Sequence, residues 1–213
     1  MIYSSFASHL APVICWALSK RKDSGYGSFV LLIYCAYALV SDAVLLNTTD
    51  DSVILALLSL FTMIEYSVFA YVIFSILESR LLKGIIIIAS LELYLYSIIY
   101  YFTTINARFD SLPASIESIL IIIYCMFFLY EQVAKSEITF IYQFRGFWFV
   151  AAFIIYFSGN LFLFVVANQL PSHLVQNSWQ INLILTIILN AILSVAFTFP
   201  ANNKLKAWET ELS

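Results

Sequence analysis

Long apolar runs alternate with short polar connectors along the whole chain. Each run is close to the roughly 20 residues that a helix needs to cross a hydrocarbon core of about 30 Å. Breaks at charged and turn-forming clusters predict seven such helices. Their expected ranges are 2–19, 28–47, 52–77, 85–105, 114–134, 147–170 and 178–200. The pattern therefore predicts an all-α, seven-transmembrane-helix bundle as a single domain over 1–200, followed by a short tail over 201–213.

The basic residues predict how this bundle is oriented. Of the 10 Lys and Arg, only Arg108 lies in a connector on one side; the others lie in connectors on the opposite side or in the tail. Cytoplasmic loops are enriched in Lys and Arg. We therefore expect the N-terminus outside and the C-terminus in the cytoplasm. Trp16 and Trp148 at predicted inner ends and Trp179 at an outer end fit the interfacial position of tryptophan.

The composition excludes several classes of protein. Hydrophobic residues make up 62 % of the chain and charged residues 11 %, whereas soluble domains carry about 25 % charged residues. With a net charge of -3 and no basic run long enough to bind nucleic acid, no nucleic-acid partner is expected. Cys15, Cys35 and Cys125 all lie in apolar runs and are interpreted as buried hydrophobic residues. We expect a multi-pass protein of a cell membrane, the bacterial inner membrane, with the lipid bilayer as its partner.

Three carboxyl groups lie well inside the predicted spans, namely Asp42, Glu65 and Glu92. An ionisable residue at the centre of a spanning helix costs about 2.5–3.5 kcal/mol on insertion scales, and such residues usually mark function. No Lys or Arg lies deep in a span to pair with them, so each is expected to be neutral, hydrogen-bonded or facing water. Glu117 and Glu131 lie near span ends and are expected to reach interfacial water.

Amides and hydroxyls form stripes beside these acids, at helical spacing along the last two predicted spans. Such groups either hold helices together, at about 0.6 kcal/mol for each hydrogen bond, or line a cavity that binds a ligand or moves a proton. For Asp42 and Glu65 the functional interpretation is favoured, because neutral groups would join helices at lower cost. The predicted ligand-binding or proton-binding site comprises Asp42, Glu65, Glu92, Tyr156, Asn160, Asn182 and Asn190.

Known catalytic signatures are missing from the chain. The last predicted helix has no Lys, which excludes a retinal Schiff base there, and there is no P-loop, nucleophile elbow or HExxH motif. No catalytic residue, cofactor or metal is predicted. His9 and His173 are expected near the outer face as solvated or interfacial side chains. An outer metal site that joins them to Asp42, Asp50 or Asp51 is the lesser alternative.

Residues 147–164 read FWFVAAFIIYFSGNLFLF. Together with Trp179, Asn182 and Asn190, this helix resembles a family of uncharacterised bacterial seven-helix integral membrane proteins. The resemblance implies the same helical fold. It brings no catalytic residues with it, and proteins of this kind are sometimes encoded near sensor kinases.

Three functions remain open from the sequence. The first is a non-enzymatic sensor or accessory subunit with an outward-opening polar cavity and a signalling partner in the membrane. The second is a small proton-coupled transporter that uses Glu65 and Asp42 as protonation sites. The third is a lipid hydrolase resembling the lysoplasmalogenases, which the absence of a membrane-embedded His makes less favoured. The oligomeric state is not predicted.

Overall fold

The computed structural model describes residues 2–19, 26–48, 50–103, 111–134, 141–166 and 172–199. Within these ranges the fold is all-α. The elements are α1 (Ile2–Ser8), α2 (Leu10–Leu18), α3 (Tyr26–Asn47), α4 (Asp51–Ile76), α5 (Arg80–Thr103), α6 (Ser111–Ala134), the 3-10 helix η1 (Ile141–Gln143), α7 (Arg145–Val166) and α8 (Ser172–Ala196). Six of them, α3 to α8, are long and apolar enough to cross a membrane, as a multi-pass membrane protein requires.

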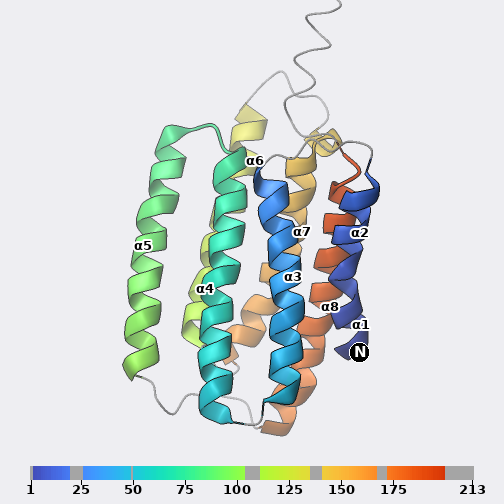
Figure 1. Cartoon of the computed structure of the whole chain (residues 1–213). Helices are drawn as coiled ribbons and strands as arrows, with labels where there is room; N and C mark the ends of the chain where they lie inside the picture. Colours follow the sequence, from blue (N-terminus) through green and yellow to red (C-terminus); the bar gives the residue numbers. More distant parts are fainter. Residues whose placement is uncertain are drawn as a thin grey trace, which may run out of the picture.

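The helices stand side by side in one bundle, with consecutive long helices running in opposite directions (Figure 1). Helix α5 forms one edge and contacts α4 and α6. Helices α3, α4, α6 and α7 form the middle of the bundle, and α8 packs against α7. The short helices α1 and α2 cover α8 at the other edge. The polar residues of α3, α4, α7 and α8 can therefore meet in the interior, whereas α5 cannot contribute to that region.

The first apolar run forms two short helices rather than the single predicted helix over 2–19. The break falls at His9, between α1 and α2. Pro12 lies in the first turn of α2 and is buried. A proline has no N–H to donate to the carbonyl four residues earlier, here that of Ser8, and its ring crowds the same carbonyl. The helical hydrogen bonding is therefore interrupted at His9, but the backbone of His9 keeps helical angles (φ -62°, ψ -21°). His9 thus lies on the same helical face as Ser5 and Pro12, which are also buried.

The predicted boundaries of the long helices lie within six residues of those observed, and the largest differences are at the starts of α8, at Ser172 instead of 178, and of α5. Helix α5 begins at Arg80, although the prediction began this helix at residue 85. Arg80 and Lys83 both lie in its first turns, and Lys83 Nζ lies 5.0 Å from the ring centroid of Phe74. Long basic side chains carry their charge beyond a helix end along an apolar stem. A basic cluster therefore does not end an apolar helix.

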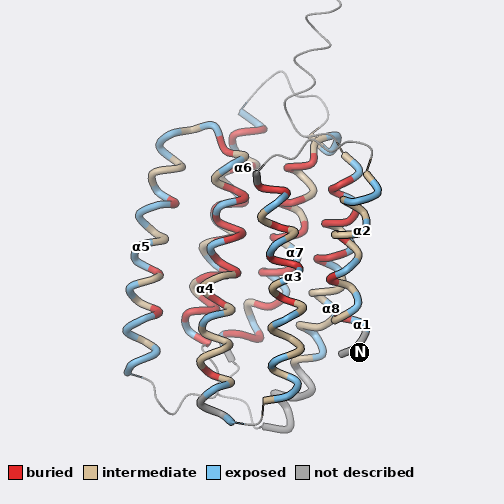
Figure 2. The backbone as a smooth tube through the Cα atoms, viewed as in Figure 1, coloured by how far each residue is buried: buried red, intermediate tan, exposed pale blue. Residues whose placement is uncertain are grey.

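Aromatic rings make up much of the packing in the middle of the bundle. Phe69 of α4 has its ring centroid 4.9 Å from that of Tyr34, 4.5 Å from that of Phe153 and 5.4 Å from that of Phe157. Burial is concentrated on the helix faces that meet there, while α5 is largely exposed (Figure 2). In the apolar windows, 50 % of the residues are buried in α6 and in α7, but only 11 % in α5. Helix α5 is thus the most loosely packed of the long helices.

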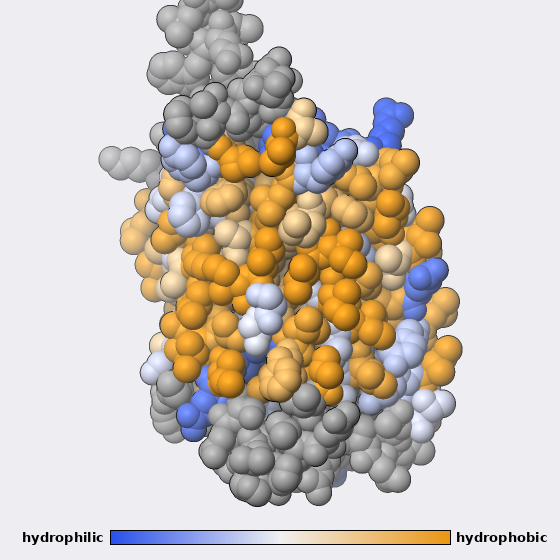
Figure 3. Space-filling view, turned by 180° about the vertical axis from the view of Figure 1, so that it is seen from behind, coloured by the Kyte–Doolittle hydropathy of each residue, from blue (hydrophilic) through white to orange (hydrophobic). Residues whose placement is uncertain are grey.

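The face shown in Figure 3 is hydrophobic over most of its height, with hydrophilic residues mainly toward the two ends and a few at mid-height near one edge. The basic residues Arg80, Lys83 and Arg145 belong to the starts of α5 and α7, which lie at the same end of the bundle (Figure 1). The other Lys and Arg of the sequence lie outside the described residues. An apolar surface of this kind requires hydrocarbon around it, which agrees with an integral membrane protein.

Two charged side chains connect different helices through hydrogen bonds at this end. Arg145 is buried and donates from Nη1 to Ser28 Oγ at 3.1 Å and from Nε to the carbonyl of Phe199 at 3.1 Å. Glu131 accepts the backbone N–H groups of Glu78 and Ser79 at 2.9 and 2.7 Å. The prediction that Glu131 reaches interfacial water is wrong, because it is buried and satisfies the backbone of the turn between α4 and α5.

Candidate functional site

Glu65 is the centre of the first group of buried polar side chains. It lies near the middle of α4 and is 3 % exposed. The hydroxyl of Tyr34, a buried residue of α3, donates a hydrogen bond to Glu65 Oε1. Tyr156 of α7 is also buried and interacts with Glu65. The carboxyl group is therefore in contact with two phenols from two other helices, in a region rich in aromatic side chains.

Tyr156 continues the group toward α8. It interacts with Asn182, whose Nδ2 donates to Asn160 Oδ1 at 3.3 Å. Tyr156 and Asn160 are four residues apart on α7, so both project from one face of that helix. Glu65 and Asn160 are thereby connected through Tyr156 and Asn182. We call Tyr34, Glu65, Tyr156, Asn160 and Asn182 the Glu65 group.

A second group forms around His9, at the break between α1 and α2. His9 Nε2 lies 3.4 Å from Asp42 Oδ2 of α3, and His9 Nδ1 lies 3.2 Å from Asn190 Nδ2 of α8. Asn190 Nδ2 also donates to Ser8 Oγ at 2.8 Å. The His9 side chain is 4 % exposed and that of Asp42 37 %. We call Ser8, His9, Asp42 and Asn190 the His9 group; it extends from the interior to the surface at Asp42.

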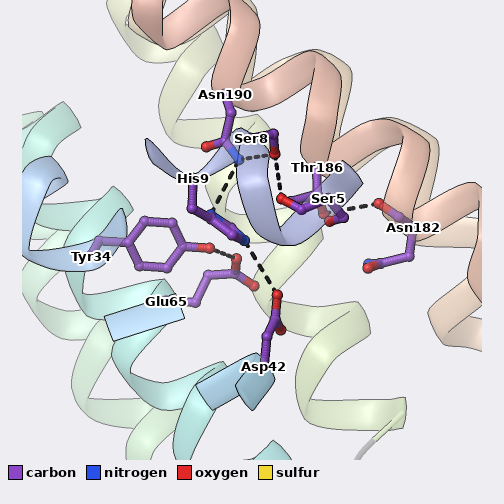
Figure 4. A network of polar contacts seen from close by, with 9 residues as sticks. All are labelled: Ser5, Ser8, His9, Tyr34, Asp42, Glu65, Asn182, Thr186 and Asn190. Carbon is purple, nitrogen blue, oxygen red and sulfur yellow. Dashed lines mark hydrogen bonds and ion pairs between the residues drawn. The ribbon is translucent and has the colours of Figure 1, made fainter. Parts of the chain in front are cut away.

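Helix α8 carries residues of both groups. Asn182, Thr186, Asn190 and Ser194 follow one another at four-residue spacing and so lie along one face of the helix. The hydroxyls of Thr186 and Ser194 donate to the backbone carbonyls of Asn182 and Asn190 on the same helix. The amide side chain of Asn182 bonds to α7, and that of Asn190 contacts Ser8 of α1 and His9. Figure 4 shows Asn182, Thr186 and Asn190 together with Tyr34, Asp42 and Glu65.

Two amide atoms in these groups have no hydrogen-bond partner among the described residues. They are Asn160 Nδ2, a donor, and Asn190 Oδ1, an acceptor. Both residues are fully buried. Buried polar atoms are nearly always hydrogen-bonded, because an unmet one costs about 1–3 kcal/mol. Each atom therefore has capacity for a further partner, such as a small polar molecule.

His9 is the residue that the sequence interpretation missed. It was expected near the outer face as a solvated or interfacial side chain, and this expectation is wrong because His9 is 3 % exposed. Packing of α1 and α2 against α8 encloses it. The signal in the sequence was the spacing of Ser5, His9 and Pro12, which places all three on one helical face, and all three are buried. The argument that no membrane-embedded His exists no longer applies.

Glu117 was also interpreted wrongly. It was expected to reach interfacial water, but it is 1 % exposed and lies within electrostatic range of Tyr66 and Tyr156. Glu117 lies in the first turns of α6, and this nearness to the helix end is what suggested an interfacial residue. Because α6 packs closely against α4 and α7, the side chain points into the bundle instead.

Glu92 lies apart from both groups. It is exposed on α5, and that helix contacts only α4 and α6 among the long helices. The structure thus brings together Glu65, Tyr156, Asn160 and Asn182, places Asp42 with Asn190 in the second group, and leaves Glu92 outside.

A separate cavity of about 190 Å³ lies between α4, α5 and the start of α6. It is lined almost entirely by apolar atoms, and its hydroxyl-bearing residues are Ser59, Ser97 and Tyr101. None of the residues of the Glu65 group or the His9 group lines it. This cavity therefore has volume for a small molecule but few polar atoms to form hydrogen bonds with it.

The described residues include no set of three or more His, Cys, Asp and Glu side chains placed to hold a metal ion. The alternative of an outer metal site involved His173 and Asp51, whose side chains lie outside the described residues. His9 and Asp42 do meet, but as a pair in which the imidazole also contacts an amide.

Comparison of the chain with protein families, with curated proteins and with solved structures gives no match. The resemblance to bacterial seven-helix membrane proteins therefore stays a prediction, and the functional argument depends on the site itself.

Proposed function

We propose that this chain is an integral membrane protein of seven spans that binds a small polar ligand at the Glu65 and His9 groups. It acts without catalysis, as a sensor or accessory subunit that passes the signal to a membrane partner. The seventh span in this proposal is α1 and α2 taken together. Helix α1 begins in the half of the bundle opposite the starts of α5 and α7, which carry Arg80, Lys83 and Arg145 (Figure 1). The enrichment of cytoplasmic loops in basic residues then favours an N-terminus outside.

The observation that carries this proposal is a pair of buried amide atoms without a hydrogen-bond partner among the described residues, Asn160 Nδ2 and Asn190 Oδ1. Each belongs to a group that also contains a carboxyl side chain. A structural role alone would favour polar atoms that satisfy one another, because a partly satisfied network costs more than an apolar contact. Unmet atoms are expected instead where a ligand completes the hydrogen bonding. The 37 % exposure of the Asp42 side chain offers the ligand an approach from the surface.

The charges of the two groups favour a particular ligand chemistry. Asp42 and Glu65 contribute carboxyl oxygens, and the described part of neither group contains a Lys or Arg. Hydrogen-bond acceptors of this kind suit a small molecule that carries N–H or O–H donors, and a protonated amine in particular.

Thermal unfolding of the purified chain tests this proposal, with ammonium, methylammonium and ethanolamine as separate probes. A ligand at about one hundred times its dissociation constant stabilises the folded state by about 2.7 kcal/mol, which raises the melting temperature by several degrees. We expect such a rise for the wild type and its loss in Glu65→Gln with all three probes. In Asn160→Leu the rise should be lost with ethanolamine, whose hydroxyl oxygen can accept a hydrogen bond from Asn160 Nδ2. Glu92→Gln is the matched control, since it removes a carboxyl group outside the site, and it should keep the rise.

If none of the three probes raises the melting temperature of the wild type, ligand binding of this chemistry is refuted. A rise that persists in both Glu65→Gln and Asn160→Leu would show binding elsewhere and would also refute the proposed site.

A small proton-coupled carrier is the second candidate, and the contact between His9 and Asp42 favours it. In the arrangement observed, Asn190 Nδ2 faces His9 Nδ1, which suits an imidazole without a proton on that nitrogen. Rotation of the Asn190 amide would present Oδ1 instead, and this would suit an imidazole protonated on both nitrogens. The His9 group could thus exchange a proton between Asp42, at the surface, and the interior.

Proteoliposomes that enclose a pH-sensitive dye distinguish this candidate. A carrier predicts proton movement when a methylammonium gradient is applied, its loss in Glu65→Gln and its retention in Glu92→Gln. Absence of proton movement in the wild type would leave the sensor or accessory role.

A further inference from the structure

The exposed face of α5 carries a carboxyl group halfway along a helix that is long enough to span a membrane. Glu92 lies 12 residues after Arg80 and 11 before Thr103, the two ends of α5. It is exposed and makes no hydrogen bond or ion pair with another described residue. The other exposed Asp, Glu, Lys and Arg side chains in the described residues, Asp50, Glu78 and Arg80, lie at or beyond helix ends.

A carboxyl group in this position needs a hydrogen-bonding partner. At the middle of a membrane it would face acyl chains, which can neither donate nor accept hydrogen bonds, and burial of an unpaired polar group is costly. The exposed faces of α3 and α6 raise no such difficulty, because the residues exposed near their middles are apolar. The requirement for a partner therefore falls on α5.

The residues around Glu92 form a regular stripe that suits helix packing. Alternating steps of four and three residues from position 81 to position 102 meet an exposed apolar side chain at every place except 92. These apolar residues are Leu81, Ile85, Ile88, Leu95, Ile99 and Phe102. A repeat of four and three is the pattern with which two helices pack in a left-handed coiled coil. The stripe covers 21 steps of about 1.5 Å, roughly the thickness of a hydrocarbon core.

We propose that this stripe is the interface with a second copy of the same chain. Two copies inserted in the same direction are related by a twofold axis along the membrane normal, so their α5 helices run parallel and each residue of the stripe meets its own equivalent. Glu92 then faces Glu92. In its neutral form a carboxyl group has one donor and one acceptor, so two such groups satisfy each other.

This proposal is independent of the ligand site. It requires only that α5 spans the membrane, and the Glu65 and His9 groups lie on helices other than α5. Failure of ligand binding would leave the dimer untouched, and the reverse also holds.

Energy transfer between donor-labelled and acceptor-labelled chains in lipid vesicles tests the proposal, with lipid added stepwise to dilute the protein. We expect the wild type to self-associate. Glu92→Lys alone should associate roughly five- to thirtyfold more weakly, because two lysines would face each other across the axis and the interhelical hydrogen bond would be lost. An equal mixture of wild type and Glu92→Lys should associate again, because Lys then meets Glu. That recovery also shows that the variant folds.

The matched control is Ile87→Lys. Ile87 is 52 % exposed on the same helix, but it lies outside the stripe. This variant should associate as the wild type does. A wild type that stays monomeric at every dilution overturns the proposal, and this is also the result that a different partner protein would give. An equal loss in Ile87→Lys and Glu92→Lys overturns it as well.

Discussion

Glu65 and Glu92 are the same chemical group near the middles of two consecutive helices, yet their surroundings are opposite. Glu65 is 3 % exposed and accepts a hydrogen bond from Tyr34, while Glu92 is exposed on the edge helix α5. Both carry the cost of a carboxyl group at mid-span. Inside the bundle this cost is offset by neighbouring helices of the same chain. On α5 it can be offset only by a molecule outside the chain.

The largest expected effect is on the free energy of unfolding, which one of two matched substitutions should lower and the other should leave equal or raise. Glu65→Leu leaves the Tyr34 hydroxyl without its acceptor and should lower the free energy of unfolding by about 1–3 kcal/mol. Glu92→Leu places an apolar side chain on an exposed apolar face, so the stability of the monomer should stay equal or rise. Unfolding in mixed micelles, followed by tryptophan fluorescence, measures both. A similar loss of stability in the two variants would contradict the comparison.

A second test compares the reactivity of the two carboxyl groups. A membrane-soluble carbodiimide should label Glu92 directly, whereas labelling of Glu65 requires local opening of the bundle. We expect Glu92 to react at least about tenfold faster, which corresponds to an opening free energy of about 1.4 kcal/mol. Mass spectrometry of the labelled peptides in dilute detergent gives both rates. Faster labelling of Glu65 would mean that the Glu65 group is open.

A smaller loss of stability is expected when a single hydrogen bond between helices is removed, either near His9 or between α4 and α5. Asn190→Leu removes the donor to Ser8 Oγ and the contact with His9, and should destabilise the bundle by about 0.6–1.7 kcal/mol. Ser67→Ala removes a hydrogen bond of 2.8 Å to Tyr94 between α4 and the peripheral α5. Its cost should lie below that of Asn190→Leu in the same unfolding assay, because Ser67 is exposed. The reverse order would show that α5 is more tightly held than its burial indicates.

The smallest effect concerns two glycines. A Cβ at Gly84 of α5 would have no neighbouring atom within 4 Å, whereas one at Gly159 of α7 would lie 2.7 Å from side-chain carbons of Leu185. Gly84→Ala should therefore stabilise the helix by about 0.5–1 kcal/mol, and Gly159→Ala should gain less or lose stability. The difference in melting temperature between the two variants measures how much closer the packing between α7 and α8 is. Equal gains would contradict the comparison.

Much of the fold follows from the order of apolar and polar residues. The ranges predicted for α3, α4 and α6 differ from those observed by at most three residues, because a helix in hydrocarbon must be apolar over its whole length. The break at His9 could not be placed in the same way. One proline in an apolar run is compatible with a kink or with two helices, and the packing of α1 and α2 against α8 decides between them.

The candidate site was only partly predictable for a related reason. The four-residue spacing of Asn182 and Asn190 identified a polar face of α8, and the spacing of Tyr156 and Asn160 did the same for α7. Their partners, Tyr34 and His9, come from helices far away in the sequence. In apolar helices such residues carry no periodic signal that separates them from core or interfacial side chains.

By itself, the sequence predicted a helical chain of seven apolar spans and placed the bounds of α3, α4 and α6 within three residues, because hydrocarbon permits only apolar segments whose backbone hydrogen bonds are internal. In the structure six of these helices are long enough to cross a membrane. The sequence also placed Glu65 near mid-span and Glu92 inside its span, and the observed start of α5 at Arg80 puts Glu92 near the middle of that helix. Only the tertiary structure decided that Glu65 faces two tyrosines, that His9 is enclosed and that Glu92 points outward. The physical reason is that the position of a residue along a helix sets its depth in the membrane. Whether its side chain is buried or exposed depends on which helices pack beside that face.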